Sequence, residues 1–424
     1  MTAGVSERTA SSIDSDVAGY SIGRKLRVGV FTESYPPVVN GVTTSVITLI
    51  AQLEKLGHDV FVFSSEFPGH KGDSDNVVRV PAMFTPFDKA YPVPLPLTPR
   101  ILKGVAKLEL DIIHTQSPFL MGIVAQRVAA AHGVPLVATN HTIYTQYVHY
   151  IPFAPRPMAE LSAHTWIGWY YSRCSTVITP SNFSASRLRS EYGVAQDRIA
   201  VIPSGIPIPE PISEEAKMEV RQRYGIPADA PVLTYAGRMA KEKNLKMLLA
   251  ACENVIFKER PDAYLLLAGA GMHAGLLKEC ASQSPLLKDR VILTGFLPRA
   301  ALDPIYATST LLAFPSLTET QGMVLGEAMA VGTPCVAVNE GGAPETVMDG
   351  IDGVRAPNDP VEFGNAVVSL LNDPERLASM RKAAVVNADC RTPERMGEKV
   401  LAVYHKALCE AAAQPVAGQV ATAS

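Results

Sequence analysis

Two glutamates, Glu319 and Glu327, stand eight positions apart in the stretch LTETQGMVLGEAMAVG. This spacing is a little over two helical turns, so one carboxylate belongs to the Thr-Gln-Gly turn and the other projects from the helix that follows. The amides of Gly322, Met323 and Val324 would open that helix, where free N–H groups and the helix dipole favour an anion. The stretch therefore predicts a site for a phosphorylated, polyhydroxylated ligand.

Two cations, Arg238 and Lys243, follow an apolar run of strand length. Fixed cations at the carboxyl end of a strand could neutralise a departing diphosphate. A solvated charged loop at the start of a helix is the alternative, and these two residues alone do not decide between them. Gly271 ends another apolar run and would allow close backbone approach to a ligand, and residues 339–345 contain paired glycines, but both segments also fit ordinary tight turns.

Polar residues also follow the apolar runs of the first half of the chain. Asn40 and Gly41 stand where a helix would begin, and Gly41 would let the chain approach a diphosphate or an acceptor. His141 ends a later run and would point its ring at the same edge, although an isolated histidine is more often structural. Asp111 and His114 are expected to shape the sheet and the wall of the cleft.

Apolar runs alternate with segments of helical periodicity on both sides of a proline-rich stretch. We expect strands at residues 26–31, 60–64, 111–114, 136–140 and 176–179, and then at 232–235, 264–268, 291–294, 311–314 and 335–338. This order predicts an α/β fold of two Rossmann-like, doubly wound domains that face each other across a cleft. Ligands of such sheets bind at the carboxyl ends of the strands, which is where the candidate residues lie.

The domain boundaries follow from the same pattern. We expect a disordered tail at 1–23, a first Rossmann-like domain at 24–206, a second at 207–390, a helix at 391–410 that crosses back to the first domain, and a second disordered tail at 411–424. The proline-rich residues 201–209 would be the linker and the hinge.

Composition excludes several classes of function. The formal charge of −3 and a pI near 6.3 give no bulk attraction to nucleic acid. The six cysteines show neither paired nor metal-type spacing, which favours a reduced, cytoplasmic setting. We expect neither a signal peptide nor a membrane span. The Asp-x-Asp triplets at 14–16 and 73–75 are interpreted as solvated, so no metal and no cofactor are expected.

The order of these motifs is similar to that of glycosyltransferase family 4, the retaining nucleotide-sugar enzymes of GT-B fold. The resemblance is carried by 40–42, 139–142, 179–181, 201–205, 237–244, 269–271 and 319–327, and it spans about residues 25–405. It implies that the domain at 24–206 binds the acceptor and that the domain at 207–390 binds the nucleotide-sugar. Glu327 would bind the ribose hydroxyls of the donor, and Glu319 would hold the transferred sugar.

The same resemblance implies roles for the remaining candidates. Arg238 and Lys243 would stabilise the diphosphate leaving group. His141 would lie beside the anomeric centre. Further donor contacts would come from Gly41, Gly271, Gly322, Met323 and Val324. The family is thought to transfer with retention, through a same-face step in which the donor phosphate helps to remove the acceptor proton.

A narrower resemblance concerns the acceptor. Residues 139–152 and 318–322 are similar to those of bacterial glucosyltransferases that act on diacylglycerol, which implies acceptor contacts from Asn40, Tyr144, Tyr147 and His149. Residues 143–171 are rich in tyrosine and contain both tryptophans, which suits an interfacial surface near lipid. An aromatic core between two helices is the alternative.

We therefore expect a retaining hexosyltransferase that moves glucose from UDP-glucose to a hydroxyl of a lipid or cell-envelope glycan. Its partners would be the nucleotide-sugar, that acceptor and the inner surface of the membrane, where the enzyme would bind peripherally from the cytoplasm. A GDP-mannose-dependent mannosyltransferase acting on a phosphoinositide-type or soluble acceptor is the first alternative. A nucleotide-sugar epimerase, or a non-catalytic carbohydrate-binding protein of the same fold, is the second.

Overall fold

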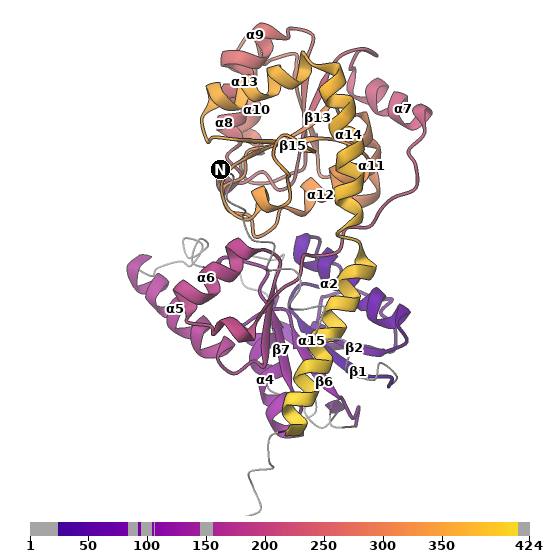
Figure 1. The fold of residues 1–424 in the computed structure, drawn as a ribbon, viewed down its shortest axis with the longest axis vertical. Coiled ribbons are helices and arrows are strands. Elements are labelled where there is room, and N and C mark those ends of the chain that lie inside the picture. The colour runs from indigo at the N-terminus through magenta and orange to yellow at the C-terminus, as the bar shows by residue number, and fades with distance from the viewer. Residues whose placement is uncertain (1–23, 84–91, 95–103, 106, 145–155, 414–424) are drawn as a thin grey trace, which may run out of the picture.

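The computed structural model describes residues 24–83, 92–94, 104–105, 107–144 and 156–413. In these residues the chain forms two α/β units, each built on a parallel sheet with helices on both faces (Figure 1). The predicted fold class is confirmed by this architecture.

The N-terminal unit has its strands in the order β3-β2-β1-β6-β7-β8-β9. These strands are β1 (Arg27–Thr32), β2 (Asp59–Ser65), β3 (Val77–Val80), β6 (Ile112–Thr115), β7 (Leu136–Thr139), β8 (Thr176–Thr179) and β9 (Ile199–Val201). The short strands β4 (Ala82–Met83) and β5 (Val93–Pro94) pair antiparallel beside it. Its helices are α2 (Gly41–Lys55), α4 (Leu120–His132), α5 (Arg156–Tyr171) and α6 (Asn182–Tyr192).

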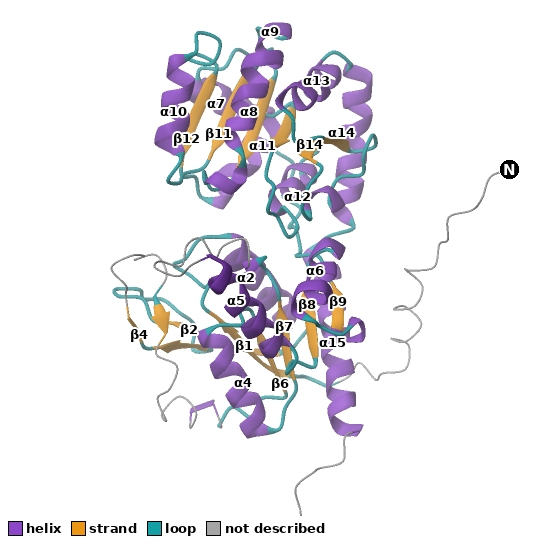
Figure 2. Ribbon diagram, turned by 90° about the vertical axis from the view of Figure 1, so that its left-hand side faces the viewer, coloured by secondary structure: helices purple, strands orange, loops and turns teal. Residues whose placement is uncertain are grey.

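The C-terminal unit has its strands in the order β12-β11-β10-β13-β14-β15. Figure 2 labels β12, β11 and β14 of this sheet, which lies among helices. The strands are β10 (Val232–Ala236), β11 (Tyr264–Ala268), β12 (Val291–Gly295), β13 (Leu311–Phe314), β14 (Cys335–Val338) and β15 (Gly353–Ala356). The helices are α7 (Glu214–Tyr224), α8 (Leu245–Ala251), α9 (Phe257–Glu259), α10 (Ala274–Gln283), α11 (Leu302–Thr308), α12 (Met323–Ala330), α13 (Pro360–Leu371) and α14 (Pro374–Asp389). In each unit the first strands are added on one side of β1 or β10, and the later strands are added on its other side. Ligands of doubly wound sheets bind at such a switch point in the strand order.

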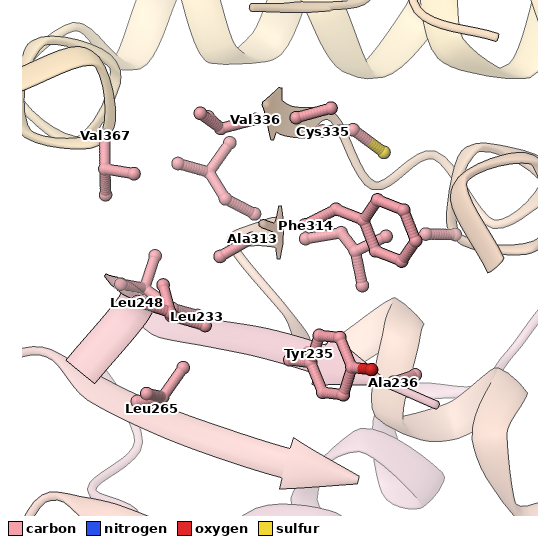
Figure 3. Packing of buried hydrophobic residues seen from close by; sticks show 14 of the residues in the cluster. Leu233, Tyr235, Ala236, Leu248, Leu265, Ala313, Phe314, Cys335, Val336 and Val367 are labelled. Atoms are coloured by element: carbon pink, nitrogen blue, oxygen red, sulfur yellow. The ribbon is translucent and has the colours of Figure 1, made fainter. Parts of the chain in front are cut away.

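The strands are apolar because both faces of a parallel sheet are covered. All residues of β10 and of β13 are buried, and Tyr235 stacks on Phe314 with ring centroids 6.2 Å apart (Figure 3). The sequence prediction missed five strands that are short or only partly buried, namely β3, β4, β5, β9 and β15. Val201 ends β9, so the predicted linker begins inside the sheet.

Local signals fix the ends of the helices. Asn40 and Ser181 accept from the backbone amides of Thr43 and Ser184 at the starts of α2 and α6. Asp359 and Asp373 do the same for α13 and α14, each followed by proline at the first helical position. These caps are readable from sequence because they involve neighbours in the chain.

The last helix, α15 (Pro393–Ala413), returns to the N-terminal unit and runs along it (Figure 1). Met396, Val400 and Tyr404 recur at helical spacing on its buried side and pack with apolar residues of β1 and α2. The chain therefore crosses between the units twice, and at the crossing Ile206 N donates to the carbonyl of Arg391 at 2.8 Å. No helix in the described part of the chain is long and apolar enough to cross a membrane.

Candidate active site

Glu319 lies in the loop between β13 and α12, at the carboxyl edge of the second sheet. Its Oε1 accepts from Lys243 Nζ at 2.5 Å and from Ser316 Oγ at 2.8 Å. Both charged side chains are less than one-fifth exposed. Burial alone would raise the pKa of Glu319, but Lys243 and the Ser316 hydroxyl outweigh it, so the pKa lies below its usual value. Glu319 is therefore held as a carboxylate.

Arg238 and Lys243 come from the same loop, which follows β10. Lys243 ends a short 3-10 turn, Lys241–Lys243, and Arg238 pairs with Glu242 at 2.5 Å. The Arg238 side chain is half exposed, whereas that of Glu242 is only 8% exposed. The loop thus presents two cations near Glu319, as the sequence predicted, but each cation is already paired with a carboxylate of the chain.

Glu327 projects from α12 into the interior, where it is 6% exposed. One carboxylate oxygen accepts from the Tyr306 hydroxyl at 2.9 Å, and the other lies 3.3 Å from Arg299 Nε. Burial raises the pKa of Glu327 even though both partners oppose the effect. Sequence reasoning missed Arg299 and Tyr306, although Arg299 follows the end of β12 just as Arg238 follows β10.

The helix α12 begins where the sequence predicted. Gly322 precedes it with φ of 75° and ψ of 64°, a left-handed conformation that favours glycine, and no side chain caps the helix. The amides of Met323 and Val324 belong to its first turn. A Cβ on Gly41 would meet Met323 Sδ at 3.8 Å, so the start of α2 faces the start of α12 across the two units.

His141 follows β7, and the C-terminal unit touches it directly. Its ring Nε2 lies 2.8 Å from Gln116 Oε1, and its carbonyl accepts from Thr320 Oγ1 at 3.0 Å. Thr320 is the neighbour of Glu319 in the chain. Burial of the imidazole lowers the pKa of His141 to about 4, so the ring is neutral at physiological pH. The structure thus brings His141 and the Glu319 loop together.

A second contact between the units involves Glu345, within the glycine-containing segment 339–345. Its carboxylate accepts from the backbone amides of Asn182 and Phe183, at 2.8 Å and 2.5 Å, and from Asn182 Nδ2 at 3.1 Å. These amides open α6, so a carboxylate of one unit caps a helix of the other. The sequence indicated only paired glycines and a tight turn in this segment, so the contact made by Glu345 was not predicted.

Two family models match the two halves of the chain. Glycosyltransferase Family 4 matches residues 39–209, and Glycosyl transferases group 1 matches residues 216–385. An alpha-monoglucosyldiacylglycerol synthase of Streptococcus pneumoniae is 32% identical over 329 residues, which cover 74% of this chain and 71% of that protein. The chain belongs to glycosyltransferase family 4. It is therefore a glycosyltransferase.

Other members of the family differ in their named activities. A GDP-mannose-dependent alpha-mannosyltransferase of Corynebacterium glutamicum is 27% identical over 395 residues, or 90% of this chain and 89% of that protein. Among solved structures, HepE of Anabaena in complex with UDP has a TM-score of 0.72 at 20% identity, covering 90% of this chain and 100% of that chain. Sucrose-phosphate synthase of Thermosynechococcus elongatus has a TM-score of 0.74 at 22% identity, covering 91% and 100%. The structural likeness supports the GT-B fold.

The two glycines after β11 have a structural use that sequence reasoning did not predict. A Cβ on Gly269 would lie 2.0 Å from the carbonyl of Gly237, and one on Gly271 would lie 2.3 Å from the carbonyl of Met239. Neighbouring backbone, rather than open space for a ligand, fills those positions. A donor contact by Gly271 stays a prediction of the family resemblance.

The acceptor candidates are only partly described. Asn40 uses its side-chain oxygen to cap α2, accepting from Thr43 N at 2.8 Å. Tyr144 packs against the N-terminal core, edge to face with Phe119 at a centroid distance of 5.0 Å. Tyr147 and His149 lie outside the described residues.

The aromatic stretch is divided between core and surface. Tyr170 and Tyr171 are fully buried, so for these two the expected interfacial role was wrong. They pack in the core because α5 must cover the sheet with its apolar side. On the other side of the helix, Leu161 and Trp169 are exposed.

The 73–75 triplet is exposed, as predicted, and Asp73 is in addition engaged by charged neighbours. Its carboxylate accepts two hydrogen bonds from Arg79, both at 2.8 Å, and lies 3.1 Å from His70 Nε2. Arg79 also donates to the carbonyl of Pro36 at 2.7 Å, so the pair ties down the loop after β1. Residues 14–16 lie outside the described part, in which no cluster of potential metal ligands is found.

Proposed function

We propose that this enzyme is a retaining glucosyltransferase that transfers glucose from UDP-glucose to a hydroxyl of a lipid acceptor. The observation that carries the proposal is the convergence of Lys243, Glu319 and the His141 loop at facing sheet edges. The loop that carries the neutral imidazole contacts Thr320 of the loop whose carboxylate is paired with the cation, and this set of groups suits binding of a sugar diphosphate.

The donor would bind mainly to the C-terminal unit. Glu327 would accept hydrogen bonds from the ribose, while Arg299 and Tyr306 keep its carboxylate oriented. Arg238 and Lys243 would stabilise the diphosphate as negative charge develops on it. To reach the phosphate they must leave Glu242 and Glu319, so donor binding exchanges internal ion pairs for pairs with the substrate.

The transfer would then proceed on one face of the sugar. The bond between the anomeric carbon and the diphosphate oxygen breaks, the acceptor oxygen bonds to the same face, and the acceptor proton passes to a phosphate oxygen. Glu319 would hold the sugar hydroxyls, and the residues present supply the charge stabilisation that this step needs. We propose that neither a metal nor a cofactor takes part.

A lipid acceptor is supported by the Streptococcus pneumoniae relative, whose name specifies a glucosyldiacylglycerol product. Leu161 and Trp169 are exposed on α5 of the N-terminal unit, and Arg173 Cζ lies 3.9 Å from the centroid of the Trp169 ring. Together they form an apolar and basic surface on the unit that would bind the acceptor. We propose peripheral contact of this surface with the cytoplasmic face of the membrane.

A mannosyltransferase using GDP-mannose is the second candidate, favoured by the Corynebacterium glutamicum relative that aligns with 90% of this chain. Both candidates share the same ion pairs at the cleft, so the donor itself must be tested. A panel of nucleotide-sugars incubated with membrane lipid extract and read by mass spectrometry separates them. Glucosylated lipid supports the proposal, whereas mannosylated product alone would replace it with the second candidate.

The role of Glu319 has its own test. We expect Glu319→Ala to abolish transfer while UDP still binds, because the nucleotide contacts lie elsewhere. Glu340→Ala, which alters an exposed carboxylate in a neighbouring loop, should retain activity. Equal transfer by Glu319→Ala and the wild type would refute the assigned role.

A further inference from the structure

The environment of His141 contains one partner that the proposed function does not use, namely Gln116. Gln116 follows the last residue of β6 and is 3% exposed. The backbone N–H of Gln116 donates to the carbonyl of Phe31 at 2.8 Å, so its backbone is fixed to the neighbouring strand. The side chain then reaches the end of β7, where Oε1 lies 2.8 Å from His141 Nε2.

Burial keeps the imidazole neutral, and in a neutral ring this contact selects the tautomer. The oxygen of an amide only accepts hydrogen bonds, so Nε2 of His141 carries the proton and Nδ1 carries the lone pair. No hydrogen bond to His141 Nδ1 is found among the described residues. A neutral ring of this kind can accept a hydrogen bond at Nδ1 and cannot act as a proton donor there.

The surroundings keep the ring neutral. A pocket of about 20 Å³ lies beside the pair, with Ser45, Thr139 and Ser204 among its polar lining. The lining residues from α2, the hinge and α15 include no carboxylate and no cation. The titratable neighbour is His114 on β6, whose nitrogens lie 2.6 Å from the Tyr404 hydroxyl and 2.7 Å from Thr139 Oγ1.

Gln116 lines the same pocket, and its side-chain amide has a second polar atom, Nε2. Gln116 Nε2 is buried and has no hydrogen-bond partner among the described residues. The pocket is large enough for one water molecule, which could accept from Nε2 and donate to a serine hydroxyl. Such a water would fix the orientation of the amide and, through it, that of the histidine.

The backbone of His141 is held independently, by Thr320. Because Thr320 adjoins Glu319 in the C-terminal unit, the position of His141 depends on both units at once. Gln116 contacts the imidazole ring of His141, and Thr320 contacts its backbone carbonyl. A group that contacts a sugar must be oriented closely, since small displacements of a contacting atom strongly reduce the rate.

We propose that Gln116 is a positioning residue that holds His141 as the tautomer protonated on Nε2, leaving Nδ1 to accept a hydrogen bond from a hydroxyl of the bound sugar or acceptor. This inference deepens the proposed transferase function and rests on it for the identity of the hydroxyl. The tautomer itself is independent of that function.

The first test is spectroscopic and needs no substrate. The protein is labelled with [¹⁵N]histidine, and the His141 signals are assigned from their absence in His141→Gln. We expect a protonated Nε2 and an unprotonated Nδ1, unchanged between about pH 5 and about pH 8 because the pKa of His141 lies near 4. Protonation on Nδ1 in the wild type would overturn the inference.

The second test uses substitutions at Gln116. Gln116→Met removes the acceptor at similar size, so we expect a mixture of tautomers and a kcat about tenfold lower, with UDP affinity unchanged. Gln116→Glu places a carboxylate at the ring, which raises the pKa of His141. In that variant kcat should fall as pH drops through the raised pKa, while the wild type shows no such fall. The exposed Gln222→Met serves as the matched control.

The outcomes separate the two proposals. If Gln116→Met keeps the wild-type tautomer and kcat, Gln116 does not position His141, and the transferase function stands. If the wild type transfers no sugar from any nucleotide-sugar, the proposed function fails, and the nitrogen spectra still decide the role of Gln116. If Gln116→Met fails to fold, the pH profile of Gln116→Glu and the wild-type spectra provide the decision.

Discussion

Single residues in this site carry charges that are matched within the protein before any substrate binds. Lys243 and Glu319 are both mostly buried and lie 2.5 Å apart. Taking two charges out of water is costly, and the cost is offset only while both partners are present. The pair therefore has two uses: it keeps Glu319 ionised, and it stores a cation close to where a diphosphate would bind.

We predict that Lys243→Met destabilises the fold by about 3 kcal/mol, because it leaves the Glu319 carboxylate buried without its cation. Transfer should fall at least about a hundredfold, since a diphosphate contact is also lost. Urea unfolding and steady-state kinetics measure the two effects. Lys241→Met, on the exposed side of the same turn, should change stability by less than about 0.5 kcal/mol.

The interpretation of Lys243 predicts a non-additive rescue. If the buried carboxylate causes the loss, adding Glu319→Gln to Lys243→Met should restore part of the stability, because the unpaired charge is removed. A double variant as unstable as the sum of the two single variants would contradict this explanation.

The same pair gives a pH dependence with a definite sign. In the wild type the pKa of Glu319 is lowered, so the pair's stabilisation is complete above the ordinary carboxyl pKa and is lost as pH falls through the lowered value. In Lys243→Met burial dominates, and the pKa of Glu319 rises. We therefore predict that the acid limb of kcat/KM moves to higher pH in Lys243→Met and stays in place in Lys241→Met.

At the scale of elements, the two units are connected by the ends of helices and strands. Glu345 caps α6 across the domain boundary, and the Arg391 guanidinium donates to the Glu345 carbonyl at 3.0 Å. The Arg391 carbonyl also accepts a hydrogen bond from the backbone N–H of Ile206, where the chain crosses between the units. The α6 cap and the crossing segments thus both contact Arg391, so we expect a displacement of one to displace the other.

We predict that Glu345→Ala destabilises the contact between the units by about 1–2 kcal/mol, the usual effect of losing a helix cap. Hydrogen exchange should rise at the first-turn amides of α6, including Phe183, and remain unchanged at the start of α13. Glu340→Ala is the control, because Glu340 is exposed nearby. Unaltered exchange at Phe183 would show that the cap does not hold the units together.

At the scale of the whole molecule, α15 makes the N-terminal unit depend on the end of the chain. Tyr404 of α15 is fully buried in that unit, and its hydroxyl contacts His114. The two crossings lie against each other where Gly205 meets Pro393. If these two adjacent crossing segments act as the predicted hinge, the units would rotate about one line, which is the motion expected for closure around a substrate.

We predict that Gly205→Ala disturbs this crossing, because its Cβ would lie 2.6 Å from Pro393 Cα. Backbone cannot yield as a flexible side chain does, so the cost should be about 1–3 kcal/mol. In the presence of UDP, small-angle scattering should report a more open envelope for Gly205→Ala than for the wild type. Gly275→Ala, where a Cβ meets nothing within 4 Å, should leave the envelope and stability unchanged.

Much of the fold could be predicted because its signals are local. The apolar runs at β8, β11, β13 and β14 coincide with strands, since strands buried on both faces read as continuous apolar segments. The start of α12 at Met323 followed from the preceding glycine. Strands β3 and β9 were missed, because their residues are partly exposed and resemble those of loops.

The sequence by itself determined the alternation of strand and helix, and with it the carboxyl edges at which Arg238, Lys243 and Glu319 must gather. It determined these because hydrophobic periodicity and turn residues act between near neighbours in the chain. Only the tertiary structure decided that Lys243 pairs with Glu319 and that Tyr306 donates to Glu327. It also decided that His141 is contacted by Gln116 of its own unit and by Thr320 of the other unit. Those contacts join residues far apart in the chain, so they depend on sheet order and on the angle at the hinge, which no local pattern specifies.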